Sequence, residues 1–274
     1  ILYNRKKYNE AIEQFKLIDL QKSKNYLLRC LYSTDQKSNF YKQLDSMINQ
    51  GESNAVIGSL VSRSKIKYKI NKSNPFCNDP LKYILKTNLY EKCDFKNIFI
   101  NTARNILKED KILSKTQGYL TNGRQTAGNI FALEGDHIDK IKNVIHSEIE
   151  RYYIHFKNSK EGFLRKWPAS YTINGWLVNM KSGGSLNAHM HDTGWITGSI
   201  YINVPLKSKT NSGNLVVCLD DEEYEAEEKN KEKNIINVIT GSLCLFPASL
   251  LHYTIPFEAE EDRIVLAFDV VPKL

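Results

Sequence analysis

The last third of the chain contains closely spaced segments that favour β-strands, and these limit the possible folds more than any other feature. Residues 194–205 and 263–272 are rich in β-branched and aromatic residues, and each ends at a proline, which cannot donate to a central strand ladder. Residues 234–241 and 242–247 are two further strand-like runs with a glycine turn between them. Several short strands with turn residues between them predict a closed or sandwiched β architecture.

Three histidines flank these strand-like segments. His189 and His191 precede the first segment, and His252 follows residues 242–247. In a β-strand, side chains at i and i+2 leave the same face. The Cα atoms of His189 and His191 would then lie about 6 to 7 Å apart, and their imidazoles could converge on one ion. Asp192 would then point the opposite way. We therefore predict a metal site formed by His189, His191 and His252.

The full ligand set has alternatives. A redox iron that binds a small oxo-acid and dioxygen needs few protein ligands, and the usual set is two histidines and one carboxylate. Here His191 stands where that set would have Asp or Glu. Three imidazoles, two imidazoles with Asp192, and two imidazoles with water are all chemically possible. The two-residue period of a strand favours His191.

Arg263 stands at the entrance of the last strand-like segment. Arginine stays charged and binds carboxylates through a planar fork, so it could hold the distal carboxylate of 2-oxoglutarate. There is a simpler interpretation for each feature. Arg263 could be a surface residue paired with Glu260 or Glu261. His189 and His191 could be hydrogen-bonded imidazoles that bind no metal. The strand, the third histidine and the arginine together favour the metal site.

An ordered set of motifs accompanies these residues. They are residues 74–83 (NPFCNDPLKY), 123–131 (GRQTAGNIF), Gly175 with Trp176, 189–191 (HMH) with Gly194, Trp195 and Gly198, 245–247 (LFP), His252, and 263–268 (RIVLAF). The set resembles the 2-oxoglutarate- and Fe(II)-dependent oxygenases, within the branch that often follows tetratricopeptide-like helices. The resemblance covers residues 74–274.

The resemblance implies roles for single residues. His189 resembles the first iron ligand and His252 the distal one. Arg263 resembles the residue that pairs with the far carboxylate of 2-oxoglutarate, and Tyr201 the tyrosine that hydrogen-bonds the same group. Asn179 occupies a place where this superfamily often has a polar group facing the co-substrate. The cofactors implied are Fe(II), 2-oxoglutarate as co-substrate and O2.

The N-terminal third favours helices. Residues 8–15 repeat small and large apolar residues at helical spacing and look like the end of one tetratricopeptide unit. Residues 26–31, 40–49 and 55–61 are further predicted helices, and a run of Ser, Lys and Asn at 71–74 ends the helical part. Such helices need stacked neighbours, so a protein partner for this lobe is plausible.

We expect an α+β protein. A tetratricopeptide-like helical lobe at 1–73 would precede an oxygenase domain at 74–274. Its core, at about 165–274, would be a double-stranded β-helix, also called a jelly roll or cupin-like barrel. Helices predicted at 95–107 and 138–156 would brace the sheet.

The residues between these two helices have a different character. Residues 118–131 are a glycine- and polar-rich passage that lacks the lysine of a phosphate-binding loop. We expect the acidic run at 220–228 to be a solvated connection between strands; the alternatives are a lid or a site for a cationic substrate.

Charge and cysteine content limit the partners and the compartment. Of the 274 residues, the first 80 hold 14 Lys+Arg against 7 Asp+Glu, so the whole net charge of +7 lies there. The lysines are not clustered with aromatic residues, so nucleic-acid binding is disfavoured. Five cysteines without metal-ligand or disulfide spacing favour the cytoplasm, and no apolar run is long enough to cross a membrane. The first residues suggest a fragment of a longer chain.

The function we predict is that of a dioxygenase. It would hydroxylate an unidentified substrate, a small molecule or a protein, with release of succinate and CO2. Two alternatives remain. One is a cupin-type metal enzyme that does not use 2-oxoglutarate, and the other is a noncatalytic binding module.

Overall fold

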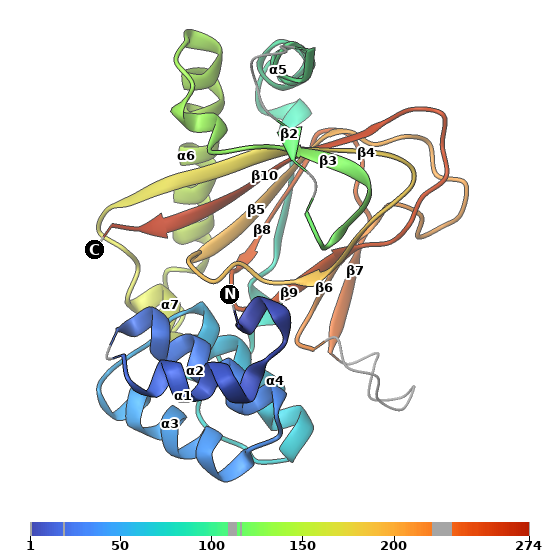
Figure 1. Ribbon diagram of the computed structural model, residues 1–274. Helices are drawn as coiled ribbons and strands as arrows, with labels where there is room; N and C mark the ends of the chain where they lie inside the picture. The colour runs from blue at the N-terminus through green and yellow to red at the C-terminus, as the bar shows by residue number, and fades with distance from the viewer. Residues whose placement is uncertain (1, 19, 109–113, 116, 221–231, 274) are drawn as a thin grey trace.

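The computed structural model describes residues 2–18, 20–108, 114–115, 117–220 and 232–273, and it begins with a lobe of four helices (Figure 1). They are α1 (Tyr8–Lys16), α2 (Gln21–Ser33), α3 (Lys37–Asn49) and α4 (Ala55–Tyr68). Leu28, Phe40 and Leu44 are fully buried in the core that these helices share. Asn54 caps α4, because its side-chain oxygen accepts a hydrogen bond from the Ile57 amide at 3.0 Å. All four predicted N-terminal helices lie within these elements.

A ten-stranded antiparallel sheet forms the rest of the core. Its strands are β1 (Leu85–Asn88), β2 (Ser114–Lys115), β3 (Leu120–Thr126), β4 (Tyr171–His189), β5 (Ile196–Asn203), β6 (Leu215–Cys218), β7 (Lys233–Ile236), β8 (Ser242–Pro247), β9 (Leu251–Thr254) and β10 (Arg263–Pro272). The order is β1-β8-β5-β10-β4-β9-β6-β7, with β3 added to β4 and β2 to β3.

Strand β4 gives the sheet its curl. Its first part, residues 171–180, pairs with β10, whereas its end, between Leu186 and His189, pairs with β9. Gly183 has a φ of 74° in the stretch between these two pairings, a conformation that favours glycine. One strand therefore belongs to two walls, and the antiparallel sheet curls around a hollow (Figure 1), consistent with a double-stranded β-helix.

The two faces of the sheet have different partners. Leu266 and Phe268 of β10 are buried in one core with Ile141 and Ile145 of helix α6 (Asp136–Phe156). The alternate residue Val265 points the other way and packs in a separate cluster inside the curl, together with Tyr201. Helix α6 therefore braces the outside of the sheet, as predicted, and leaves the inside for a cavity.

Other sequence expectations need correction. The polar passage at 118–131 contains β3, because it finds a strand partner in β4 that no local pattern shows. The run at 234–241 is a strand only as far as Ile236. The helix expected at 95–107 starts with a π-helical segment (Lys96–Asn101) before α5 (Thr102–Lys108). Apart from Asp220, the acidic run at 220–228 lies outside the described residues.

The junction between the helical lobe and the sheet is aromatic. Phe76 is fully buried, with its ring centroid 5.6 Å from that of Phe163 and 5.0 Å from that of Trp195. On the lobe side, a Cβ built on Gly58 of α4 would lie 2.8 Å from the Phe76 Cβ, so only glycine lets the helix approach this closely. Helix α7 (Gly162–Arg165) supplies Phe163. None of the described helices has the length and apolarity needed to span a lipid bilayer.

We predict that Phe76→Ala lowers the free energy of unfolding by about 3 to 5 kcal/mol, because it leaves a cavity between packed rings. Urea denaturation followed by circular dichroism measures this. Ile154→Ala is the control, since Ile154 is 50% exposed on α6 and its loss should cost less than about 0.5 kcal/mol. Equal midpoints for the two variants would contradict a structural role for Phe76 at the junction.

Candidate metal centre

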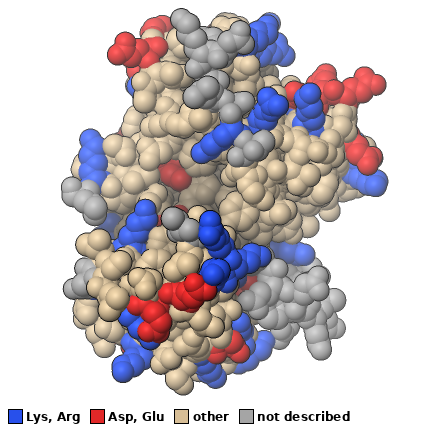
Figure 2. All heavy atoms as spheres, in the orientation of Figure 1, with Lys and Arg blue, Asp and Glu red and all other residues tan. Residues whose placement is uncertain are grey.

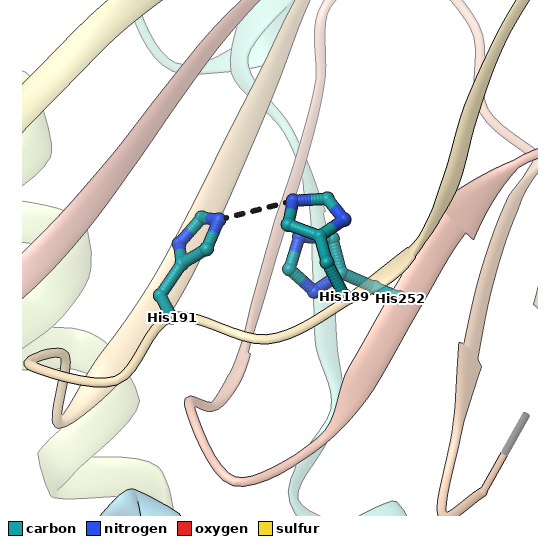
Figure 3. A group of neighbouring side chains, drawn as sticks. All are labelled: His189, His191 and His252. Atoms are coloured by element: carbon teal, nitrogen blue, oxygen red, sulfur yellow. Dashed lines mark hydrogen bonds between the residues drawn. The ribbon is translucent and has the colours of Figure 1, made fainter. Parts of the chain in front are cut away.

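Three imidazoles meet at the open end of the curl. His189 ends β4, His252 lies in β9, and the two residues are directly paired in the antiparallel register. His191 follows two residues later. Each ring offers a nitrogen, and these three nitrogens lie within 4.8 Å of one another. In the view of Figure 3, the ring of His189 lies in front of that of His252, and His191 approaches both from the side.

The two-residue period of a strand does not account for the position of His191. Strand β4 ends at His189, so His191 lies in the following loop and not on the pleat of the strand. The ring centroid of His191 is nevertheless 5.2 Å from that of His189 and 4.9 Å from that of His252. The loop and the β4–β9 pairing therefore bring together side chains that the strand period alone does not place.

Hydrogen bonds leave imidazole nitrogens available for a metal ion. With Nδ1 protonated, His189 donates to the carbonyl of Asn187 at 2.9 Å and His191 donates to Asp269 Oδ1 at 2.7 Å. Their Nε2 atoms then face each other at 3.3 Å. Nδ1 of His252 is buried and has no hydrogen-bond partner. Such a set of fixed rings with an unsatisfied buried nitrogen fits a transition-metal ion.

Burial and neighbouring charges give the three histidines different pKa values. Desolvation, reinforced by His191, lowers the pKa of His189 to about 4. Desolvation with both neighbouring rings holds the pKa of His252 well below its ordinary value. Burial also opposes the charged form of His191, but the carboxylate of Asp269 outweighs it, so the pKa of His191 is raised. At neutral pH, His189 and His252 are therefore neutral and able to bind a cation.

The three histidines line a cavity of about 330 Å³ inside the curl. Arg263 and Tyr201 lie in the same cavity, with apolar walls from Val178, Met180 and Leu215. Trp176 is beside the three histidines, with its ring centroid 5.3 Å from that of His191. The cavity thus joins the cluster of three histidines to a positively charged group.

Arg263 is only 2% exposed, and no described carboxylate lies within ion-pair distance of it, so it is not a surface residue paired with Glu260 or Glu261. Its guanidinium carbon lies 5.1 Å from the centre of the Tyr201 ring, and its Nε atom is buried without a partner. Burial lowers the pKa of Arg263. A buried cation without a counter-charge is costly, so this end of the cavity fits an anionic ligand such as a carboxylate.

Two other candidate residues lie apart from the cluster. Asp192 accepts a hydrogen bond from Arg29 of α2 at 2.5 Å, and this ion pair ties the loop after His191 to the helical lobe. The side chain of Asn179 donates to Asp262 at 2.9 Å, and Asn179 is not among the residues that line the cavity. Its neighbours on β4, Val178 and Met180, line the cavity instead, as expected for alternate faces of a strand.

Asp269 and Gln125 are polar residues of the cavity region that were not among the candidates from the sequence. Asp269 lies six residues after Arg263 on β10, so the two-residue period of the strand places it on the inner face and could have identified it. Gln125 lines the cavity from β3, with its side-chain oxygen buried and unpartnered. It belongs to the motif at 123–131, but that passage was not expected to form a strand, so its place on the inner face of the sheet was not predicted.

A second hollow separates the helical lobe from the sheet. It has a volume of about 630 Å³ and is lined by Tyr26 and Arg29 of α2 and by Asp192 and Trp195. Figure 2 shows one face of the molecule hollowed between the lobe and the sheet, with mostly uncharged surface in the hollow. On the face shown, the Lys and Arg side chains of the lobe are mixed with Asp and Glu and form no continuous basic patch.

Part of the chain that carries this site is similar to a known family. Residues 174–269 match the family model described as "Putative 2OG-Fe(II) oxygenase". A search of curated proteins gave no match. This segment contains all three histidines, Tyr201 and Arg263.

Several solved structures share the fold at low identity. A prolyl-4-hydroxylase from Pseudomonas putida has a TM-score of 0.50 at 11% identity, covering 72% of this chain and 97% of its own. A prolyl hydroxylase from Trichoplax adhaerens, in complex with a peptide of hypoxia inducible factor, has a TM-score of 0.51 at 15% identity, covering 80% and 90%. The α-ketoglutarate-dependent epimerase SnoN from nogalamycin biosynthesis has a TM-score of 0.50 at 10% identity, covering 69% and 76%.

The matched segment, the fold and the cluster of three histidines beside a buried arginine agree with one another. Residues 174–269 are therefore similar to the 2-oxoglutarate- and Fe(II)-dependent oxygenases, and the chain shares the fold of the solved prolyl hydroxylases.

Proposed function

We propose that the protein hydroxylates a C–H bond of its substrate, with His189, His191 and His252 as the iron ligands and Arg263 as the anchor of 2-oxoglutarate. In the overall reaction, substrate R–H, 2-oxoglutarate and O2 give R–OH, succinate and CO2. The observation that carries this proposal is the buried, uncompensated guanidinium of Arg263 in the same cavity as the three imidazoles.

Bound Fe(II) supplies redox chemistry and open coordination positions for O2 and the 2-oxo acid. The chain's own residues have other tasks. Arg263 binds the distal carboxylate of 2-oxoglutarate and so fixes the direction in which the co-substrate lies in the cavity. Tyr201, 1% exposed and beside Arg263, offers its hydroxyl to the same carboxylate. The apolar walls exclude water from the reacting groups.

The substrate remains a small molecule or a protein. The prolyl hydroxylase from Trichoplax adhaerens binds a peptide, whereas SnoN acts in the biosynthesis of a natural product, so the shared fold serves both classes. The hollow between α2 and Trp195 begins at the loop that follows His191. It is our candidate for the place where the substrate meets the helical lobe.

The proposal also covers the helical lobe, the domain boundary and the cellular compartment. Helices α1 and α2 form a pair in which Phe15 stacks on Tyr26 at 5.5 Å, which supports a tetratricopeptide-like unit able to contact a protein partner. We place the boundary between this lobe and the jelly-roll oxygenase domain at residues 73 and 74. A reducing compartment such as the cytoplasm is part of the same proposal, because the five cysteines lack the spacing of a disulfide framework.

His252→Ala should abolish succinate release from 2-oxoglutarate, because two imidazoles with a missing third ligand bind Fe(II) weakly. The assay contains Fe(II), ascorbate and O2, and mass spectrometry quantifies succinate. His155→Ala is the matched control, since His155 is exposed on α6. Circular dichroism checks that both variants fold. Undiminished succinate release by a folded His252→Ala protein would rule out this ligand set.

Arg263→Met should raise the KM for 2-oxoglutarate at least about 30-fold, which corresponds to about 2 kcal/mol for a lost buried charge partner. The same variant should be no less stable than the wild type when 2-oxoglutarate is absent, because it removes an unpaired buried charge. Arg124→Met is the control, since Arg124 is exposed on the neighbouring strand β3. An unchanged KM for Arg263→Met would show that the co-substrate is anchored elsewhere.

The metal-free protein should lose stability as the pH falls from 6.5 to 4. An unfolded histidine takes up a proton near its ordinary pKa of 6.5, whereas burial holds the pKa of folded His189 at about 4. In this window the unfolded state binds more protons, so the free energy of unfolding falls with falling pH. His252 acts in the same direction, and His191, with its raised pKa, opposes them.

The test compares urea denaturation of metal-free variants across this range. His189→Asn should flatten the loss of stability between pH 6.5 and 4, because the variant cannot take up the proton. His155→Asn should follow the wild type. Parallel curves for His189→Asn and the wild type would mean that His189 titrates normally in the folded protein.

A further inference from the structure

Asp269 is a buried carboxylate next to the candidate metal centre. It lies on β10, is 5% exposed, and pairs in register with Asn174 on β4 and Thr197 on β5. Arg263, Val265 and Ala267 precede it on the same face of the strand, and all three line the cavity. On the inner face of β10, Asp269 therefore lies six residues along the strand from Arg263.

Its contacts point to His191. Asp269 Oδ1 accepts hydrogen bonds from His191 Nδ1 at 2.7 Å and from Thr197 Oγ1 at 2.9 Å. Gly194 makes room for it, since a Cβ at that position would lie 3.0 Å from the same oxygen. Among the described residues, His191 is the one side chain able to carry positive charge within ion-pair distance of Asp269. A carboxylate this deeply buried is costly unless it is paired.

The contact between Asp269 and His191 bears on the net charge of the candidate metal site. A set of two histidines and a carboxylate brings one negative charge to Fe(II). The cluster of His189, His191 and His252 brings none. The carboxylate of Asp269 lies one imidazole further out and contacts the ring that occupies the carboxylate position of the usual set. A carboxylate that accepts the Nδ1 proton of a ligand histidine orients the ring and makes its Nε2 a stronger donor.

We propose that Asp269 is a positioning residue that acts through His191 and supplies the negative charge that a carboxylate ligand would otherwise bring to the metal. The inference rests on the proposed metal site. It extends the site from three histidines to a four-residue unit, in which Asp269 fixes both the orientation and the donor strength of His191.

The test uses Co(II), whose visible absorption reports its ligands, and the full chain. Asp269→Asn keeps the shape of the side chain and an oxygen that accepts from His191, but it removes the charge. We expect Co(II) binding to weaken about 10- to 100-fold, with a changed absorption spectrum. Asp262→Asn is the matched control, since Asp262 precedes the same strand and hydrogen-bonds Asn179. It should bind Co(II) as the wild type does.

A double-mutant cycle separates charge supplied through His191 from a general structural effect. His191→Asp brings a carboxylate directly to the metal, so adding Asp269→Asn to that variant should change Co(II) affinity by less than about twofold. Equal losses from Asp269→Asn in the wild-type and His191→Asp backgrounds would overturn the proposal. Unchanged affinity and spectrum for Asp269→Asn alone would also overturn it.

A measurement on the wild type does not depend on the folding of any variant. In the Zn(II)-loaded protein, NMR should show the Nδ1 proton of His191 shifted downfield and protected from solvent exchange by its bond to Asp269. Rapid exchange of that proton would contradict the inference. Absence of Zn(II) or Co(II) binding by the wild-type protein would instead overturn the proposed metal site itself, so the two failures are distinguishable.

Discussion

The pairing of β4 with β9 is the interaction on which the site depends. It places His189 opposite His252 in the antiparallel register, at the end of a strand that has already crossed from one wall of the sheet to the other. Without the bend near Gly183, β4 would continue alongside β10, and the two histidines would lie in different parts of the molecule. The curl of the sheet and the meeting of His189 with His252 are thus consequences of the same strand path.

The cavity inside this curl is lined by three histidines and one buried arginine whose charge states differ. Two imidazoles are kept neutral by burial, one is held by a carboxylate, and a guanidinium without a counter-charge lies in the same cavity. This arrangement suits a cation at the histidines and an anion at Arg263. Binding of a metal ion and a dicarboxylic acid would satisfy both.

The helical lobe is connected to the site more closely than a separate module would be. Arg29 of α2 binds Asp192, one residue after His191, and Phe76 packs between α4 and Trp195 of the same loop region. The lobe therefore supports the loop that carries a predicted metal ligand. Its position also makes it one wall of the hollow in front of that loop.

The sequence by itself determined the strand-rich C-terminal part and the four N-terminal helices, and it indicated His189, His191, His252 and Arg263 as candidate site residues. These are local signals: strand composition, helical spacing and residue types with clear chemistry. The tertiary structure alone decided that β3 is a strand, that His191 reaches the cluster from a loop, that Asp192 faces Arg29, and that Asp269 contacts His191. Each of these depends on a partner distant in the chain, and no local pattern encodes the position of a distant partner.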